Sequence, residues 1–130
     1  MEQKTKILIV DDEQTNIKIL LEILDFEDAY ITKTVTSGEE CLAVLPEFGP
    51  DIILLDIMMS GMDGYDVCRH IRKDPVHCDV KILILSGRAM PDEIHKGIDA
   101  GADNYISKPF GMNDLLDALK KLLQNHEGSE

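Results

Sequence analysis

Acidic side chains follow two short apolar runs of the chain. Asp11 and Asp12 come directly after residues 6–10, and Asp56 comes directly after residues 52–55. Three carboxylates that lie a few ångströms apart repel one another by energies on the order of 1 kcal/mol or more per pair at a protein surface. A hard divalent cation offsets that repulsion, and Mg²⁺ prefers oxygen ligands of this kind. The pattern therefore predicts a magnesium site, provided that the two runs end side by side.

Two further strand-like segments, one apolar and one half-polar, end in groups that suit phosphoryl chemistry. Ser86 follows residues 82–85, and Lys108 follows residues 104–107. Asp56 is able to act as a nucleophile that forms an aspartyl-phosphate. Lys108 would then pair with a phosphoryl oxygen, and the Ser86 hydroxyl would donate a hydrogen bond to another. Each residue alone is also typical of an ordinary turn or helix cap, so the prediction depends on their convergence at one place.

The elements that must position these groups alternate along the chain. Apolar runs bounded by turn residues indicate strands near residues 6–10, 30–35, 52–56, 82–85 and 104–107. Helical spacing follows each strand, as in the set Ile17, Leu20, Leu21 and Leu24. Strict alternation predicts an α/β fold with a parallel five-stranded sheet covered on both faces. The wholly apolar strands belong at the centre, which predicts the flavodoxin-like, doubly wound (βα)5 order 2-1-3-4-5.

This strand order has a switch point between its first and third strands, where ligands bind in such sheets. Those two strands end in Asp11-Asp12 and Asp56, so topology and residue pattern indicate the same crevice. Local signals predict a capped second helix that starts at Ser37 and is closed by the segment from Pro46 to Pro50. The helix after Pro91 has only Ile94 and Ile98 at helical spacing, so we expect it to be weakly anchored and easy to shift.

Composition limits the classes of function. A chain of 130 residues suits one domain, and 25 acidic against 13 basic residues give a net charge of −12. This excess of acid argues against direct nucleic-acid binding or attachment to an anionic membrane. Residues 1–6 lack the apolar stretch of a secretory signal, so a cytoplasmic location is expected. The three cysteines show no C-x-x-C spacing, which disfavours a disulfide framework or a zinc site.

Together these motifs resemble a response-regulator receiver domain of two-component signalling, of the chemotaxis-regulator-like kind. The resemblance rests on Asp11-Asp12, Asp56 with the run from Met58 to Gly64, Ser86-Gly87, Gly101-Ala102-Asp103 and Lys108-Pro109-Phe110. It covers essentially the whole chain. We therefore place the receiver domain at residues 1–124 and a polar tail or the start of a linker at residues 125–130.

The resemblance implies that Asp56 is the phosphoacceptor, supplied by a histidine kinase or a histidine phosphotransfer protein. It implies that Mg²⁺ is held by Asp11 or Asp12, by Asp56 and by the backbone carbonyl of Met58. It also implies that the Lys108-Pro109 peptide is cis. The domain would be a signalling phosphoacceptor that promotes only its own phosphorylation and dephosphorylation, and not an enzyme in the ordinary sense.

The resemblance further implies a switch in which Ser86 moves toward the phosphoryl group and Tyr105 turns inward. The face built from the fourth helix, the fifth strand and the fifth helix would then control an output domain or a partner protein, and a phosphorylation-dependent dimer is one expected form. Met58 and Arg88 flank the site and would tune the lifetime of the phosphoryl group. Ser60 stands where the family usually has proline, so its loop is expected to be less rigid.

Two other functions stay open at this point. An aspartyl-phosphate hydrolase of the haloacid-dehalogenase type would carry a second aspartate two positions after Asp56, where this chain has Met58. A metal-independent interaction module with a vestigial site would lack part of the acidic, hydroxyl and lysine set, which is complete here. The sequence does not distinguish a stand-alone regulator from the receiver of a longer protein, and it does not identify the kinase, the output or the oligomeric state.

Overall fold

The computed structural model describes residues 4–59, 61–87 and 90–127, the last four as backbone only. Five parallel strands form one sheet in the order β2-β1-β3-β4-β5, which confirms the predicted order. The strands are β1 (Thr5–Val10), β2 (Tyr30–Val35), β3 (Ile52–Asp56), β4 (Lys81–Ser86) and β5 (Asn104–Ser107). The helices are α1 (Gln14–Asp25), α2 (Gly38–Phe48), α3 (Gly64–Arg72), α4 (Pro91–Ala100) and α5 (Met112–Glu127).

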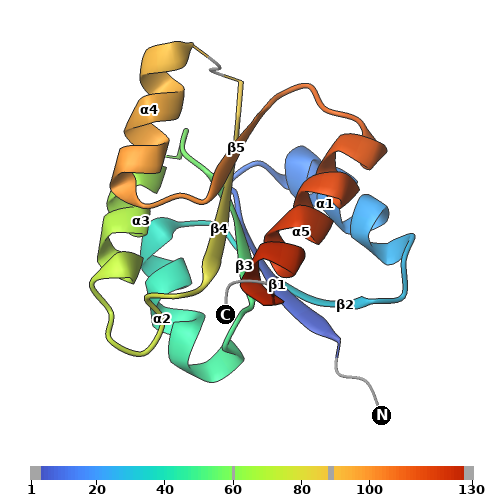
Figure 1. Cartoon of the computed structure of the whole chain (residues 1–130), viewed down its shortest axis with the longest axis horizontal. Coiled ribbons are helices and arrows are strands. Elements are labelled where there is room, and N and C mark those ends of the chain that lie inside the picture. The colour runs from blue at the N-terminus through green and yellow to red at the C-terminus, as the bar shows by residue number, and fades with distance from the viewer. Residues whose placement is uncertain (1–3, 60, 88–89, 128–130) are drawn as a thin grey trace.

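The sheet is covered on both faces, and each face has its own apolar core. Figure 1 shows α1 and α5 on one side of the sheet and α2, α3 and α4 on the other. Successive residues of the central strands point to opposite faces, so Leu8 joins the core beneath α2, α3 and α4, whereas Ile7 joins the core beneath α1 and α5. Each of β1, β3 and β4 contains four consecutive apolar residues, and burial on both faces accounts for these runs.

Both ends of α2 follow their local signals. The Ser37 hydroxyl accepts a hydrogen bond from the backbone N–H of Glu40, which confirms the predicted cap of α2. The helix ends within the predicted segment 46–50, because its last residue is Phe48 and Gly49 follows with φ of 60°. A proline in the last turn gives up only one helical hydrogen bond there, and the left-handed Gly49 provides the actual stop.

Helix α4 is weakly anchored, as its sequence indicates, but through different residues. Its buried positions are Gly97 and Ala100, and Ile98 is 45% exposed. The expected inner face at Ile94 and Ile98 is therefore wrong for Ile98. Small residues face the sheet because α4 lies close to the strands. Helix α5 extends to Glu127, three residues into the segment that we expected to be a tail.

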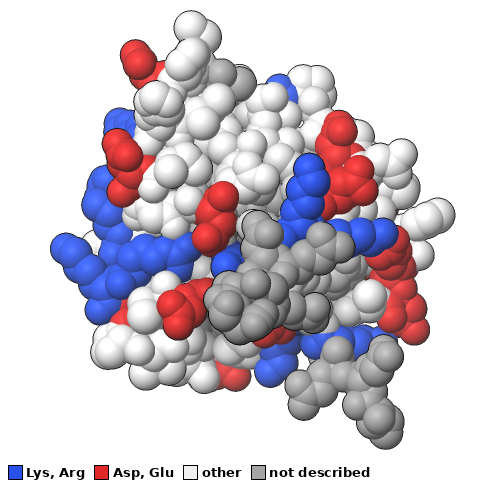
Figure 2. All heavy atoms as spheres, viewed as in Figure 1, with Lys and Arg blue, Asp and Glu red and all other residues white. Residues whose placement is uncertain are grey.

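Charged side chains of both signs cover the surface. Figure 2 shows Lys and Arg gathered on the side of the molecule where α3 lies. The α3 guanidinium groups have acidic partners, since Arg69 pairs with Asp66 at 2.8 Å and Arg72 pairs with Asp103 at 2.9 Å. We therefore assign no anionic ligand to this group. Within the described part of the chain, no helix combines the length and apolar character needed to cross a bilayer.

Candidate functional site

Two strand ends place the first pair of carboxylates next to each other. Strands β1 and β3 pair with Val10 opposite Leu55, so Asp11 and Asp56 leave the sheet at the same level. Both are buried, with exposures of 1% for Asp11 and 6% for Asp56. Each carboxylate accepts a backbone N–H from two residues further along, Glu13 for Asp11 and Met58 for Asp56, both at 2.9 Å. These turns hold the two side chains in a fixed orientation.

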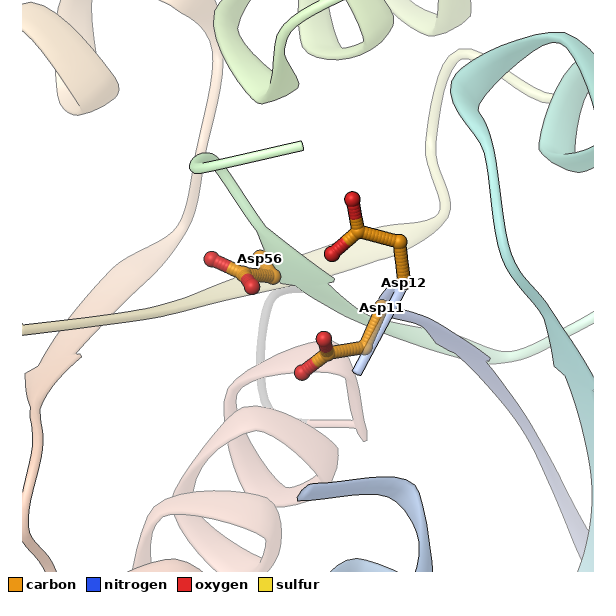
Figure 3. A group of neighbouring side chains, drawn as sticks. All are labelled: Asp11, Asp12 and Asp56. Carbon is orange, nitrogen blue, oxygen red and sulfur yellow. The ribbon is translucent and has the colours of Figure 1, made fainter. Parts of the chain in front are cut away.

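A third carboxylate completes an acidic cluster. Carboxylate oxygens of Asp11, Asp12 and Asp56 all lie within 4.8 Å of one another, and Figure 3 shows the three side chains gathered where β1 and β3 end. Burial raises the pKa of Asp11 from 3.8 to about 6, against the lowering effect of the Glu13 N–H, and the negative charge of Asp56 adds to the rise. Ionising Asp11 at neutral pH therefore costs free energy, which a bound metal ion would offset.

The cluster fits a magnesium ion by the chemistry of its donors. Three oxygen donors converge, one of them exposed to solvent, which suits a hard ion that keeps several of its waters. Burial and the nearby Asp56 charge raise the pKa of Asp11, and a bound cation would favour its ionised form. Met58 is adjacent to the cluster through its N–H, and the role of its carbonyl as a ligand stays a prediction.

Lys108 brings a positive charge to the same place from the end of β5. Its Nζ atom lies 3.8 Å from Oδ2 of Asp11 and 3.8 Å from Oδ2 of Asp56. Its backbone N–H donates to the Ser86 carbonyl at 2.7 Å, which ties the end of β5 to the end of β4. The Lys108-Pro109 peptide is cis, as the resemblance implied. The structure therefore brings Asp11, Asp56 and Lys108 together around one small space.

The two predicted switch residues lie on the strands beside the cluster. Ser86 is fully buried at the end of β4, opposite Ser107 of β5. Tyr105 is half-buried and packs against the core beneath α2, α3 and α4. Met58 is 51% exposed at the rim of the site. Arg88, the other residue expected to tune phosphoryl lifetime, lies outside the described residues, as does Ser60.

One motif of the resemblance has no place in this site. Residues 101–103 precede β5 and so lie at the opposite edge of the sheet. Asp103 accepts the backbone N–H of Ile82 at 2.8 Å and the guanidinium of Arg72 at 2.9 Å. Arg72 also donates to the carbonyl of Gly101 at 2.8 Å. These contacts join α3, β4 and the turn after α4, so the motif is structural.

Sequence reasoning missed Tyr65, whose hydroxyl contacts α4. Tyr65 is 5% exposed on α3, and its hydroxyl donates to Oε1 of Glu93 at 2.7 Å. It lies three residues before Cys68 and six before Ile71, which are both fully buried on α3. That spacing was a usable signal for its burial. Its contact with α4 depended on tertiary structure.

Comparisons with known proteins agree with this geometry. The family model described as "Response regulator receiver domain" matches residues 7–120. A probable transcriptional regulator, ycf27, of Guillardia theta is 40% identical over 124 residues, which is 95% of this chain and 47% of the relative. The response regulator MprA of Mycolicibacterium vanbaalenii is 37% identical over 119 residues, which is 92% of this chain and 50% of the relative. The chain thus spans about half the length of these relatives.

Solved structures show the same fold. A putative response regulator from Chloroflexus aurantiacus superimposes with a TM-score of 0.89 at 31% identity, covering 94% of this chain and 99% of that one. The BeF3-activated DrrB receiver domain gives a TM-score of 0.83 at 30% identity, with coverage of 94% and 99%. The family model alone matches most of the chain, over the residues that contain the acidic cluster and Lys108. This chain therefore belongs to the response-regulator receiver domain family of two-component signalling.

Proposed function

We propose that Asp56 is the phosphoacceptor of this receiver domain and that phosphorylation switches the molecule. The observation that carries the proposal is the surroundings of the Asp56 carboxylate. It lies 3.8 Å from the Lys108 ammonium and within 4.8 Å of the carboxylates of Asp11 and Asp12. A nucleophile, a fixed cation and a group of metal-binding oxygens are the parts that phosphoryl transfer to a carboxylate requires.

The transfer is a displacement at phosphorus. A carboxylate oxygen of Asp56 attacks the phosphorus of a phosphohistidine on a histidine kinase or phosphotransfer protein, and the P–N bond breaks. The electron pair of that bond stays on the departing imidazole, which takes up a proton. Lys108 balances negative charge on one phosphoryl oxygen, and the Ser86 hydroxyl donates to another. The bond from the Met58 N–H holds the Asp56 carboxylate in place.

The proposal includes magnesium as the cofactor. Asp11 or Asp12, Asp56 and the Met58 carbonyl would hold the ion. Bound there, Mg²⁺ supplies charge neutralisation for the phosphoryl oxygens. Asp11 would be a buried ligand whose orientation is already fixed, because its Oδ1 accepts a hydrogen bond from the Glu13 N–H.

A small-molecule phosphodonor tests the proposal without a cognate kinase. Incubation with acetyl phosphate and Mg²⁺ is expected to add one phosphoryl group, which intact-mass spectrometry detects. Hydroxylamine should then remove this group, because hydroxylamine cleaves acyl phosphates. Asp56→Asn should abolish the addition, and omission of Mg²⁺ should reduce it strongly. Asp117→Asn is the control, because it makes the same chemical change at an exposed carboxylate on α5. This variant should be phosphorylated like the unaltered protein. Equal phosphorylation of Asp56→Asn would reject the assignment.

The proposal extends to how the signal leaves the site. Ser86 and Tyr105 would change position on phosphorylation, and the face formed by α4, β5 and α5 would pass the change to an output domain or a partner protein. Support comes from the weak anchoring of α4 and from β5, an edge strand whose four residues are half-buried or exposed. We place the protein in the cytoplasm. We propose that it acts as a phosphoacceptor and not as an enzyme. A phosphorylation-dependent dimer is part of the proposal, and analytical sedimentation of the phosphorylated and unphosphorylated protein tests it.

A further inference from the structure

Helix α4 is held to the molecule by few contacts of its own. Only Gly97 and Ala100 are buried along its length, and neither carries a large apolar side chain. Burial of apolar area is the main source of helix anchoring, so the packing of α4 on the sheet contributes little. Any additional contact between α4 and a firmly packed element therefore has a large effect on where α4 rests.

Tyr65 of α3 supplies such a contact at the N-terminal half of α4. Its hydroxyl donates to Oε1 of Glu93 at 2.7 Å and lies 3.4 Å from the Glu93 carbonyl oxygen. The ammonium of Lys96 lies 4.8 Å from the centre of the Tyr65 ring, within the range of a cation–π interaction. Glu93 and Lys96 are three residues apart, so their side chains lie on the same face of α4, and both contact Tyr65 of α3. Figure 1 shows α3 and α4 on the same side of the sheet.

The C-terminal end of α4 is fastened by a different set of bonds. The Arg72 guanidinium donates to the Gly101 carbonyl at 2.8 Å, and the Ala102 N–H donates to the Gly97 carbonyl at 3.0 Å. Gly101 has φ of 118°, which ends the helix and turns the chain into β5. With this end fixed by backbone and guanidinium bonds, the Tyr65 contact governs mainly the other half of the helix.

The Tyr65 contact also adjoins Tyr105, the predicted switch residue. A Cβ placed on Gly97 of α4 would lie 3.1 Å from the Tyr105 ring and 2.9 Å from Ile84, so the half-buried Tyr105 ring packs against α4 where a larger residue than glycine would crowd it. Tyr65 contacts Glu93 of α4 through its hydroxyl, and Tyr105 packs at Gly97 of the same helix, so both tyrosines adjoin α4. Tyr65, Tyr105 and α4 thus form one packed group.

We propose that Tyr65 is a positioning residue that acts as a latch: its hydroxyl, bonded to Glu93, holds the N-terminal half of α4 in the resting position. Release of this bond frees α4 to shift about its fastened C-terminal end when the receiver is activated. The inference rests on the proposed function, because it assigns the latch to the switch that phosphorylation of Asp56 drives. A change that weakens the latch lowers the cost of the active arrangement without touching the acidic cluster.

The first test measures the latch in the absence of metal and phosphoryl group. Tyr65→Phe removes one oxygen atom and keeps the ring beneath α4. Hydrogen exchange of the amides of residues 94–98 is expected to become about three- to tenfold faster, which corresponds to the loss of one ordinary, part-buried hydrogen bond. Tyr30→Phe is the matched control, since Tyr30 packs against the core on the opposite side of the sheet. Unchanged exchange in Tyr65→Phe overturns the latch.

The second test asks whether the latch biases activation. Beryllofluoride with Mg²⁺ serves as the phosphoryl mimic, and its apparent affinity depends on the fraction of molecules that are ready to bind it. Tyr65→Phe is expected to bind it about three- to tenfold more tightly than the unaltered protein and the Tyr30→Phe control. Glu93→Gln keeps an oxygen acceptor without the charge and should show a smaller gain. A purely structural role predicts lower thermal stability with no gain in affinity.

The outcomes separate the latch from the function beneath it. If the unaltered protein binds beryllofluoride but Tyr65→Phe binds it no more tightly, the latch is rejected and the receiver function stands. If the unaltered protein binds no beryllofluoride, and acetyl phosphate leaves Asp56 unmodified, the proposed function is rejected. The role of Tyr65 in activation is then rejected too. Faster exchange in α4 together with tighter binding supports the proposal.

Discussion

Replacing Asp11 with asparagine is expected to stabilise the metal-free protein at neutral pH. The pKa of Asp11 lies at about 6, against an ordinary value of 3.8, chiefly because the carboxylate is buried. The difference corresponds to about 3 kcal/mol of unfavourable free energy in the folded state when the group is ionised. Solvent at the rim of the site screens part of that energy, so we expect a gain of about 1 to 3 kcal/mol from Asp11→Asn. The Oδ1 atom that accepts the Glu13 N–H is retained by asparagine.

The sign of the pH dependence follows from a folded-state pKa that is higher than that of the unfolded chain. Below the unfolded value of 3.8 the carboxyl group is protonated in both states, and the substitution has little effect. As the pH rises toward about 6, the unfolded chain loses the proton first, and the native protein loses stability relative to the variant. Above that pH the difference stays constant.

Urea denaturation at pH 7.5 and at pH 4.5, with chelator present, measures the difference in unfolding free energy. Asp117→Asn is the control, because it removes an exposed carboxylate of the same net charge. Added Mg²⁺ should stabilise the unaltered protein more than Asp11→Asn, since a bound ligand stabilises only the state that holds it. The gap between the two proteins should therefore narrow or reverse with metal.

Two results would refute this reasoning. The first is an Asp11→Asn variant that is equally or less stable than the unaltered protein at pH 7.5 without metal. The second is a gap that persists undiminished at pH 4.5, which would mean that its source is not the ionisation of this carboxylate. A gain of the same size from Asp117→Asn would point instead to the general excess of negative charge.

Two further predictions concern the rim of the site and the structural edge opposite to it. Met58→Asn is expected to shorten the lifetime of the Asp56 phosphoryl group by about tenfold, because the exposed Met58 side chain hinders the attacking water. The rate of phosphate release from purified phosphoprotein measures this lifetime. An unaltered rate would show that Met58 is not a barrier to the water. Arg72→Met should lower the unfolding free energy by about 2 to 4 kcal/mol, because Arg72 donates to the Gly101 carbonyl and pairs with Asp103. Urea denaturation measures that loss, and a loss below about 1 kcal/mol would show that solvent replaces these bonds.

The sheet and its strand order were predictable because their signals are local and redundant. Runs such as residues 52–55 bury both faces of a strand, and the mixed β2 and β5 could occupy only the edges. The same rule brought Asp11 and Asp56 to one crevice, because parallel neighbours end at the same edge. The approach of Lys108 followed from its position at the end of the last strand.

The expectation for Ile98 failed because local spacing competes with packing distance. Ile98 has the spacing of a core residue, yet Gly97 and Ala100 face the sheet, since α4 lies too close to Ile84 and Tyr105 to admit a larger side chain. This outcome is not visible in a single segment, because it depends on neighbours that are distant in sequence.

By itself, then, the sequence determined the alternation of strands and helices, the strand order, and the set of acidic, hydroxyl and lysine groups that meet at one sheet edge. Periodicity and parallel pairing are enough for that, because they act between adjacent elements. Only the tertiary structure decided how deeply Asp11 is buried, and hence its raised pKa, and that the Tyr65 hydroxyl reaches Glu93 on α4. Burial and contacts between helices depend on the distances at which whole elements pack, and no local pattern contains those distances.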